Sequence, residues 1–382
     1  MLALRRGGVR VKKILHIISD SNIGGAGRYL LTYLENCDTQ NFDVGVVIPV
    51  NSKLKPEIEK LGFKFYEIEG LAEKSFSKIA VKSLIILFYS LKPDIVHAHA
   101  CLSARVAAKL CGVKAVFYTR HSVFPQSKKL TNPIGRMING FVGGILADGI
   151  ISVADAARQN LLETGISDKK IRVIYNGVNP LKKADDDEKI KIREGFGIPA
   201  DCKVVSIIAR LEEVKGHEYF IDAAKLVADK GYNAKFIIAG TGSREELLKQ
   251  YAKDKNAENV MFLGFVKNVS DLENITDIQA NASFVTEAAS LSLLEGMSIG
   301  VPAVVSDFGV NPELIKNDVN GYVVPKQNAV AMADAIVKIL DDDALYSKLS
   351  DGAVREFNSR FTAEIMTLNM EKYYNDILEG RK

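Results

Sequence analysis

The chain has 382 residues, more than one hydrophobic core usually holds, so we expect two domains of roughly 150–200 residues each. The formal net charge is only +3, and no basic stripe is interleaved with aromatic residues, which excludes a typical nucleic-acid-binding surface. The four cysteines form no C-x-x-C pair, and the longest apolar run, around residues 83–91, is far too short to span a membrane. The first residues lack the apolar segment of a signal peptide. We therefore expect a cytoplasmic protein that is at most peripheral to a membrane.

Short runs rich in valine, isoleucine and alanine alternate with longer helical patterns along the chain. Near-continuous apolar runs are typical of strands buried on both faces of a parallel sheet. In the helical pattern 217–230, Phe220, Ala223, Ala224 and Val227 share one face. The alternation predicts an α/β fold with doubly wound parallel sheets. The predicted strands are 12–19, 43–49, 94–100, 114–119, 148–153 and 171–175, then 203–209, 234–240, 259–263, 278–284 and 302–306.

A charged segment with few core residues, 181–191, separates the two sets of strands and is predicted to be a linker. We expect a Rossmann-like N-terminal domain over residues 1–180 and a Rossmann-like C-terminal domain over 181–362. The last helical pattern, within 363–382, is expected to pack back on the N-terminal domain. Ligands of such sheets bind outside the carboxyl ends of the strands, so we expect the ligand in a cleft between the two domains.

A glycine-rich turn, IGGAGR, follows the first predicted strand at residues 23–28. Gly24 and Gly25 would let the backbone approach a ligand and would present N–H groups at a helix N-terminus, which suits an anion. The turn is not a full G-x-G-x-x-G, and no acidic residue stands where a dinucleotide ribose needs one. NAD is therefore not expected.

Two cations follow the first strand of the second set. Arg210 stands at the end of that strand, and Lys215 comes five residues later, beside Gly216. An arginine fork and a lysine point charge together suit a diphosphate. An isolated pair of this kind is more often ordinary surface charge, so the binding interpretation depends on the motifs around it.

Two carboxylates, Glu287 and Glu295, stand eight positions apart in the sequence EAASLSLLE. The second lies in a helix that is predicted to begin near Ser290. The backbone N–H groups of Leu291 and Ser292 could then meet phosphate oxygens. The two carboxylates would flank that site and accept hydrogen bonds from sugar hydroxyls. The alternative is an ordinary helix with acidic residues near its start.

In this order and spacing the motifs resemble those of the family 4 glycosyltransferases, over nearly the whole chain. Such enzymes have the GT-B fold, retain the configuration of the transferred sugar and use no metal. The resemblance rests on GGAGR, DIVHAHA, YTRH, VIYNGVN, the R-x4-K-G segment, AGTG, FLGF, E-x7-E and the run from GVPAVVSDFGVNPELI to NGYVVP.

The resemblance implies roles for individual residues. Glu287 would bind hydroxyls of the donor sugar, and Glu295 would bind the ribose hydroxyls of the nucleotide. Arg210 and Lys215 would neutralise the diphosphate. His121, at the end of YTRH, would face the reacting sugar. With Glu287 and the two cations, it completes the set of candidate catalytic residues.

Further positions are assigned to donor binding by the same resemblance. Gly24 and Gly25 would close against the phosphates, and Gly264 and Phe265 would lie near the base. The chain departs from the family pattern at residues 288 and 310, where alanine and valine replace glycine. These departures concern the shape of the sugar pocket, not the nucleotide site.

His97 and His99 are two positions apart on a predicted strand and therefore point to one face. With His121 they could form a metal site. However, no carboxylate ligand is evident in the sequence nearby, so we expect no metal and no cofactor beyond the nucleotide-sugar. His99 could instead line the acceptor side. Two acidic runs, 185–188 and 341–343, are expected to be solvated loop charge and not a D-x-D metal site.

The apolar pattern over residues 134–146 has two interpretations. We expect a core helix of the first domain. With Lys128, Lys129 and Arg136 close by, the alternative is a helix that rests on a membrane carrying a lipid-linked acceptor.

The sequence thus predicts a retaining glycosyltransferase that moves a sugar from a nucleotide-sugar, most often a UDP-sugar in this family, to a carbohydrate or lipid-linked acceptor. Synthesis of bacterial surface polysaccharide or glycolipid is the expected setting. The expected partners are the donor and the acceptor, with no nucleic acid and with a possible peripheral contact to the inner face of the membrane. The alternatives are a UDP-sugar 2-epimerase of the same architecture and a non-catalytic subunit that keeps the fold.

Overall fold

The computed structural model describes residues 5–6, 9–72 and 74–380. The chain divides into two compact units, and the first ends at Gly177 and resumes at Ala363. The second unit spans Val178–Thr362, so its first residue lies three positions before the predicted start at 181. Within the described residues, no helix is both long and apolar enough to cross a bilayer.

Unit 1 is built on a seven-stranded sheet with the order β5-β4-β3-β6-β7-β8-β9, in which all neighbours are parallel. A separate antiparallel pair, β1 (Arg5–Arg6) and β2 (Val9–Arg10), precedes it. The strands of the main sheet are β3 (Lys12–Ile18), β4 (Phe42–Pro49), β5 (Lys64–Ile68), β6 (Ile95–His99), β7 (Ala115–Arg120), β8 (Gly149–Ser152) and β9 (Ile171–Val173). Its helices are α1 (Gly25–Asn36), α2 (Lys55–Lys60), α3 (Lys78–Leu91), α4 (Leu102–Leu110), α5 (Lys128–Thr131), α6 (Pro133–Leu146), α7 (Asp155–Glu163), the 3-10 turn η1 (Asp168–Lys170) and α16 (Ala363–Glu379).

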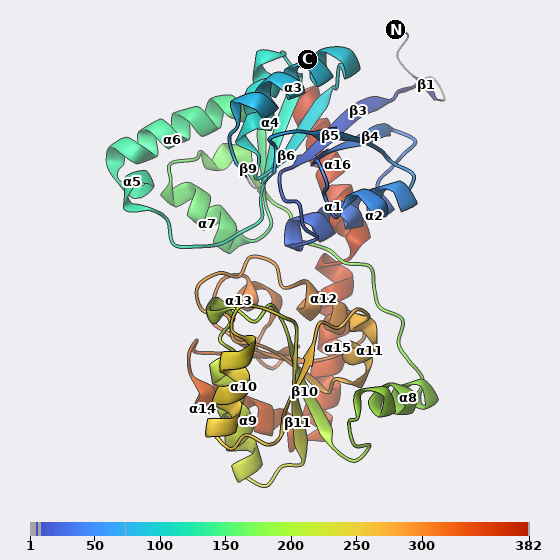
Figure 1. Cartoon of the computed structure of the whole chain (residues 1–382), viewed down its shortest axis with the longest axis vertical. Coiled ribbons are helices and arrows are strands. Elements are labelled where there is room, and N and C mark those ends of the chain that lie inside the picture. Colours follow the sequence, from blue (N-terminus) through green and yellow to red (C-terminus); the bar gives the residue numbers. More distant parts are fainter. Residues whose placement is uncertain (1–4, 7–8, 73, 381–382) are drawn as a thin grey trace. The chain divides into compact units, whose positions relative to one another are not determined.

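The C-terminal helix α16 belongs to unit 1, where it packs against α1 and β7 (Figure 1). The hydroxyl of Tyr374 lies 2.5 Å from Nδ1 of His97 on β6. Tyr29 on α1 donates its hydroxyl proton to the sulfur of Met370 at 2.9 Å. Both contacts are buried, so the last residues of the chain complete the core beside the central strands.

Unit 2 contains a second parallel sheet, with the order β12-β11-β10-β13-β14-β15. Its helix α9 buries Phe220, Ala223, Ala224 and Val227, which confirms the face predicted from the sequence. The strands are β10 (Lys203–Ile208), β11 (Ala234–Ala239), β12 (Val260–Gly264), β13 (Ile278–Asn281), β14 (Ala303–Ser306) and β15 (Gly321–Val324). The helices are α8 (Asp186–Phe196), η2 (Glu213–Lys215), α9 (His217–Asp229), α10 (Glu245–Asp254), α11 (Val269–Ile275), α12 (Leu291–Ser298), α13 (Asn311–Leu314), α14 (Ala329–Leu340) and α15 (Asp343–Arg360).

Two predictions about charged and apolar segments are wrong. The acidic run 185–188 is not a solvated loop but the start of α8, where Asp185 and Glu188 form a reciprocal capping box with each other's backbone N–H. Helix α6 is not a core helix, because Gly143 is its one buried residue. Figure 1 shows α6 in unit 1 with α5 at one of its ends and α7 below it.

Candidate functional site

The candidate residues of unit 2 lie at the carboxyl edge of its sheet. Because all six strands run parallel, the segments that follow β10, β11, β12 and β13 meet at this one edge. Arg210 follows β10 and is exposed, and Gly264 ends β12. Phe265 comes directly after it with 75% of its surface exposed. A cation and an open aromatic ring are thus present where a nucleotide would bind.

Lys215 and Glu287 form a largely buried ion pair at this edge, with Nζ of the lysine 2.7 Å from Oε2 of the glutamate. The carboxylate also accepts hydrogen bonds from Ser283 Oγ at 2.8 Å and Asn281 Nδ2 at 3.1 Å. Burial works against ionisation of Glu287, but the charge of Lys215 and these hydrogen bonds outweigh it, so the pKa of Glu287 is lowered. The carboxylate is therefore ionised at neutral pH.

Two glycines fix the backbone around this ion pair. Gly216, next to Lys215, has a φ of +67°, and a Cβ there would come within 2.3 Å of the carbonyl oxygen of Ala282. Gly309 has a φ of +61°, and a Cβ there would lie 2.1 Å from the carbonyl oxygen of Glu287. That same carbonyl accepts the N–H of Val310 at 3.1 Å. Glycine is required at both positions because a side chain would displace one member of the pair.

Helix α12 begins at this edge without a side-chain cap. Ser290 is its N-cap residue, but its side chain makes no capping hydrogen bond. The Ser290 hydroxyl instead accepts a hydrogen bond from Asn281 at 3.0 Å. The Ser290 side chain therefore accepts no hydrogen bond from the first N–H groups of the helix, those of Leu291 and Ser292. A helix start that binds an anion requires such uncapped N–H groups.

Glu295 lies further along α12, close to a carboxyl group that the sequence analysis missed. Glu273 on α11 is fully buried and accepts a hydrogen bond from the side-chain amide of Gln279. Burial raises the pKa of Glu273 well above its ordinary value, and the nearby Glu295 raises it further. Both effects favour the protonated form of Glu273.

The sequence analysis also missed Asn281 and Ser283, which bind the Glu287 carboxylate. It placed both inside a strand over residues 278–284, whereas β13 ends at Asn281. Polar residues at the carboxyl end of a central strand were the available signal. The shorter strand places these two side chains at the ligand edge.

In unit 1 the glycine turn forms the start of α1. Its N-cap residue is Gly24, which has no side chain that could cap the helix. A Cβ at Gly25 would meet no atom within 4 Å. A Cβ at Gly24 would lie 3.2 Å from the carboxylate of Asp20. The turn thus has the open backbone expected of an anion site, with one carboxylate beside it that would oppose an anion.

His121 follows β7 and is part of a row of histidine side chains. Its Nε2 lies 2.9 Å from Nδ1 of His99, and Nε2 of His99 lies 3.0 Å from Nδ1 of His16. Burial lowers the pKa of His121 and of His16 to about 3, and it lowers the pKa of His99 well below its ordinary value. The row is therefore uncharged at neutral pH. The contact between His121 and His99 uses Nε2 of His121 and does not involve its Nδ1.

The expectation that His99 lines the acceptor side is wrong, because only 1% of its surface is exposed. His99 contacts His121 from the interior. Ring nitrogens of His16, His97 and His99 lie within 4.8 Å of one another, a spacing that could hold a metal ion. However, both nitrogens of His97 already lie within 2.6 Å of hydroxyl groups, those of Thr119 and Tyr374.

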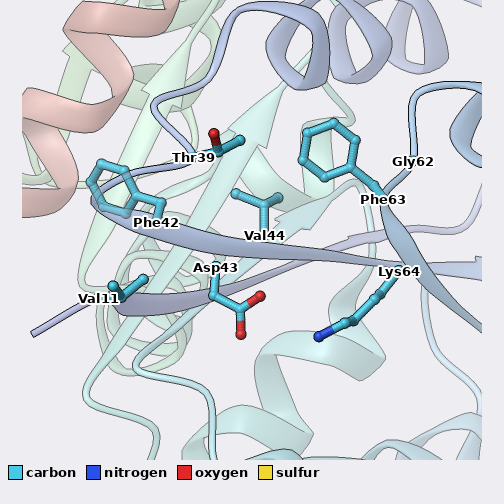
Figure 2. Close-up of a pocket in the computed structure, with 8 residues that line it drawn as sticks. All are labelled: Val11, Thr39, Phe42, Asp43, Val44, Gly62, Phe63 and Lys64. Carbon is cyan, nitrogen blue, oxygen red and sulfur yellow. The ribbon is translucent and has the colours of Figure 1, made fainter. Parts of the chain in front are cut away.

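A hollow of about 250 Å³ in unit 1 lies at the wrong edge to be part of this site (Figure 2). It is lined by residues at the beginnings of strands, namely Phe42 and Val44 of β4 and Lys64 of β5. The site residues of unit 1 follow the ends of strands. We therefore assign no function to this hollow.

Comparison with known proteins agrees with this arrangement. The model of the family described as "Glycosyltransferase Family 4" matches residues 23–181, and that of "Glycosyl transferases group 1" matches residues 188–355. The chain is 27% identical over 346 residues to the UDP-Gal:alpha-D-GlcNAc-diphosphoundecaprenol alpha-1,3-galactosyltransferase of Escherichia coli, with 87% of this chain and 89% of that enzyme covered. It is 21% identical over 378 residues to the capsular polysaccharide biosynthesis glycosyltransferase CapM of Staphylococcus aureus, covering 96% of this chain and 98% of CapM.

Among solved structures, HepE of Anabaena in complex with UDP has the same fold. The TM-score is 0.83 at 20% sequence identity, and the alignment covers 95% of this chain and 100% of HepE. The two sheets described above are thus the two Rossmann-like domains of a GT-B fold, as predicted.

The uncharged histidine row predicts that unit 1 loses stability in acid. A folded-state pKa below the unfolded value means that the unfolded chain binds more protons as the pH falls, so this stability is present above about pH 6.5 and is lost toward pH 3. With a pKa of about 3, His16 alone should cost about 2 kcal/mol at pH 5. Glu371 on α16, whose pKa burial raises to about 7, acts in the opposite direction and offsets about one histidine.

We expect unit 1 to be less stable at pH 5 than at pH 7.5 by at least about 2 kcal/mol. Urea titration with pulsed hydrogen exchange, followed in peptides from β3 and β6, measures this. Peptides from β10 in unit 2 are the internal control, since there His217, with a lowered pKa, and Glu273, with a raised pKa, act in opposite directions. Equal urea midpoints at both pH values for β3 and β6 would refute the neutral row.

Proposed function

Because the chain belongs to the family 4 glycosyltransferases, we propose that it transfers a sugar from a UDP-sugar to a lipid-linked saccharide during synthesis of a cell-surface polymer. The E. coli relative is named for a UDP-galactose donor and a diphosphoundecaprenol-linked acceptor, and HepE was solved with UDP. The observation that carries the proposal is the Lys215–Glu287 ion pair beside the uncapped start of α12.

The proposed chemistry follows from where charge develops. As the bond from the sugar's anomeric carbon to the diphosphate breaks, the ring gains positive character and the leaving group gains negative charge. Arg210, Lys215 and the first N–H groups of α12 would stabilise that growing negative charge more than they stabilise the bound donor. Each such contact contributes on the order of 3 kcal/mol to lowering the barrier.

Lys215 would act in two directions at once. One of its three N–H donors is directed at Glu287, at 2.7 Å, and the others are available to phosphate oxygens. In this proposal Glu287 keeps a free oxygen for donor-sugar hydroxyls, and Glu295 binds the ribose. The acceptor would attack from the face that the diphosphate leaves, so that the configuration is retained.

The donor site is tested by replacing Lys215 with methionine. We expect kcat for release of UDP from a UDP-sugar in the presence of acceptor to fall about 100- to 1,000-fold, because one cation facing the leaving group is lost. Lys225→Met is the matched control, since that lysine pairs with Asp229 within α9 and should leave turnover unchanged. Radiolabelled donor identifies the product. Label in an epimer instead of an acceptor, or parental turnover in Lys215→Met, would contradict the proposal.

We further propose that no metal takes part, because protein cations and a helix start would supply the positive charge that a divalent ion supplies elsewhere. Enzyme passed through chelating resin and assayed in EDTA should keep its full turnover. Metal analysis of the same sample shows whether an ion remains at His16, His97 and His99. A loss of activity that manganese or magnesium restores would refute the metal-free mechanism.

The proposed lipid-linked acceptor requires contact with a membrane, and α6 offers the surface for it. Five of its side chains recur at helical spacing on one face and are largely exposed: Ile134 68%, Met137 70%, Ile138 56%, Phe141 70% and Ile145 51%. A soluble helix normally turns such a face toward the core. We propose that this face inserts into the headgroup region of a bilayer.

Charge near α6 favours an anionic bilayer. Residues 101–147 contain seven lysines and arginines and no aspartate or glutamate. Of these, Lys128, Lys129 and Arg136 lie on α5 and α6 and are exposed. Each basic residue near an anionic surface contributes about 1 kcal/mol to binding. The proposed location is therefore the inner, anionic face of the cytoplasmic membrane.

Flotation with vesicles tests the membrane contact. The parent should float with vesicles containing phosphatidylglycerol, less so with pure phosphatidylcholine, and less in high salt. Met137→Ser with Phe141→Ser should lower the partition coefficient at least about tenfold, because two apolar anchors are lost. The control pair Leu247→Ser with Val330→Ser removes two side chains of unit 2 that are 52% and 59% exposed, and it should float like the parent. Equal flotation of both pairs would exclude α6 as the contact.

A further inference from the structure

Unit 1 contains a second hollow, of about 280 Å³, between α4, β7, α6 and α7. Arg105 of α4 and Arg120 of β7 line it together with the amide side chains of Gln126, Asn139 and Asn160. Arg120 immediately precedes His121, the candidate catalytic histidine. The hollow thus adjoins the edge of the unit 1 sheet where the site residues lie.

Arg105 is the unusual residue of this hollow. Its guanidinium stacks on the ring of Tyr118, with Cζ 4.5 Å from the ring centroid, and its Nε is buried without a hydrogen-bond partner. Among the residues that the structure describes, no carboxylate pairs with it. Partial burial of a guanidinium without a counter-charge is unfavourable, and this burial lowers the pKa of Arg105. Such a group is suited to an anion supplied from outside.

The walls of the hollow are also consistent with an anionic ligand. None of the described residues lining it is an aspartate or a glutamate. Arg120 uses its Nε for the carbonyl of Ser122 at 3.1 Å, which holds its guanidinium in place over Phe124. A second, oriented cation therefore lies in the same wall as Arg105.

Apolar side chains of α5 and α6 line the hollow where it reaches the surface. Leu130 and Val142 line it and are also 39% and 43% exposed at the surface. Leu146 and Ile150 extend the apolar lining inward. A ligand here would therefore meet cations, amide groups and partly exposed apolar side chains.

We infer that this hollow binds the phosphate of a lipid-borne acceptor, with Arg105 as its principal contact and the first part of the lipid chain along Leu130 and Val142. This inference rests on the proposed function, and it names the part of the acceptor that unit 1 recognises. The same cations could attract free phosphate, so the test separates the charged group from the chain.

The probe is decyl phosphate, used below its micelle-forming concentration and followed by titration calorimetry. The comparison ligands are decanol and inorganic phosphate. Arg105→Gln should weaken decyl phosphate binding at least about tenfold, and Arg105→Lys, which keeps a point charge, should weaken it by about threefold. Arg158→Gln is the matched control, because Arg158 already pairs with Asp155 and Asp168; it should bind within about twofold of the parent.

Binding of UDP is measured on the same samples and should be the same in all four proteins. The inference would be overturned if the parent bound UDP but bound decyl phosphate no more tightly than decanol. It would also be overturned if Arg105→Gln and the parent bound decyl phosphate with equal affinity. Either result would leave the proposed donor site unaffected. Inorganic phosphate binding as tightly as decyl phosphate would overturn the lipid part of it. Failure to bind UDP in the parent would instead count against the proposed function.

Discussion

The ion pair between Lys215 and Glu287 is the interaction on which the candidate site of unit 2 depends. A buried pair is stable only when both charges find further partners, because the interior cannot solvate them as water does. Here the glutamate has Ser283 and Asn281, and its backbone is held by the turn at Gly309. The lysine retains unused donors. In the proposed function the diphosphate would meet a cation that protein groups already position, so little reorganisation would be needed during the reaction.

The centre of unit 1 contains buried polar groups of a different kind. Instead of paired charges, the centre of its sheet holds neutral imidazoles that stack on one another, with ring centroids 4.5 Å apart between His97 and His99. Neutral rings avoid the desolvation penalty of charge while still offering hydrogen-bonding nitrogens. Ion pairs in this unit lie away from the row, for example between Lys109 and Asp148 and between Lys114 and Asp94. The candidate site of unit 2 is thus built on an ion pair, and that of unit 1 on neutral rings.

Much of the fold could be predicted because its strands are continuous apolar runs. The start of α12 was also predicted correctly, near Ser290 and within the E-x7-E segment. Other features could not. Alternation along β6 shows that His97 and His99 share a face, but not that α16, which is far away in sequence, covers that face. An amphipathic pattern can belong to a core helix or to a helix with an exposed apolar face, so the prediction that α6 is a core helix was wrong. The edge strands β5 and β15 were missed because short edge strands lack a long apolar run. The Arg105 pocket is lined by side chains from six elements, α4, β7, α5, α6, β8 and α7, and so leaves no local motif.

The position of α16 limits when unit 1 can finish folding. Unit 2 is an insertion within unit 1, because the segment that completes unit 1 comes after Thr362. The unit 1 sheet is incomplete without Met370 and Tyr374, which α16 contributes to its core. Tyr29 finds its partner 341 positions downstream, which makes this contact among the most non-local in the chain. Unit 1 therefore cannot complete its core before α16 has been made, whereas the residues of unit 2 are contiguous in the chain.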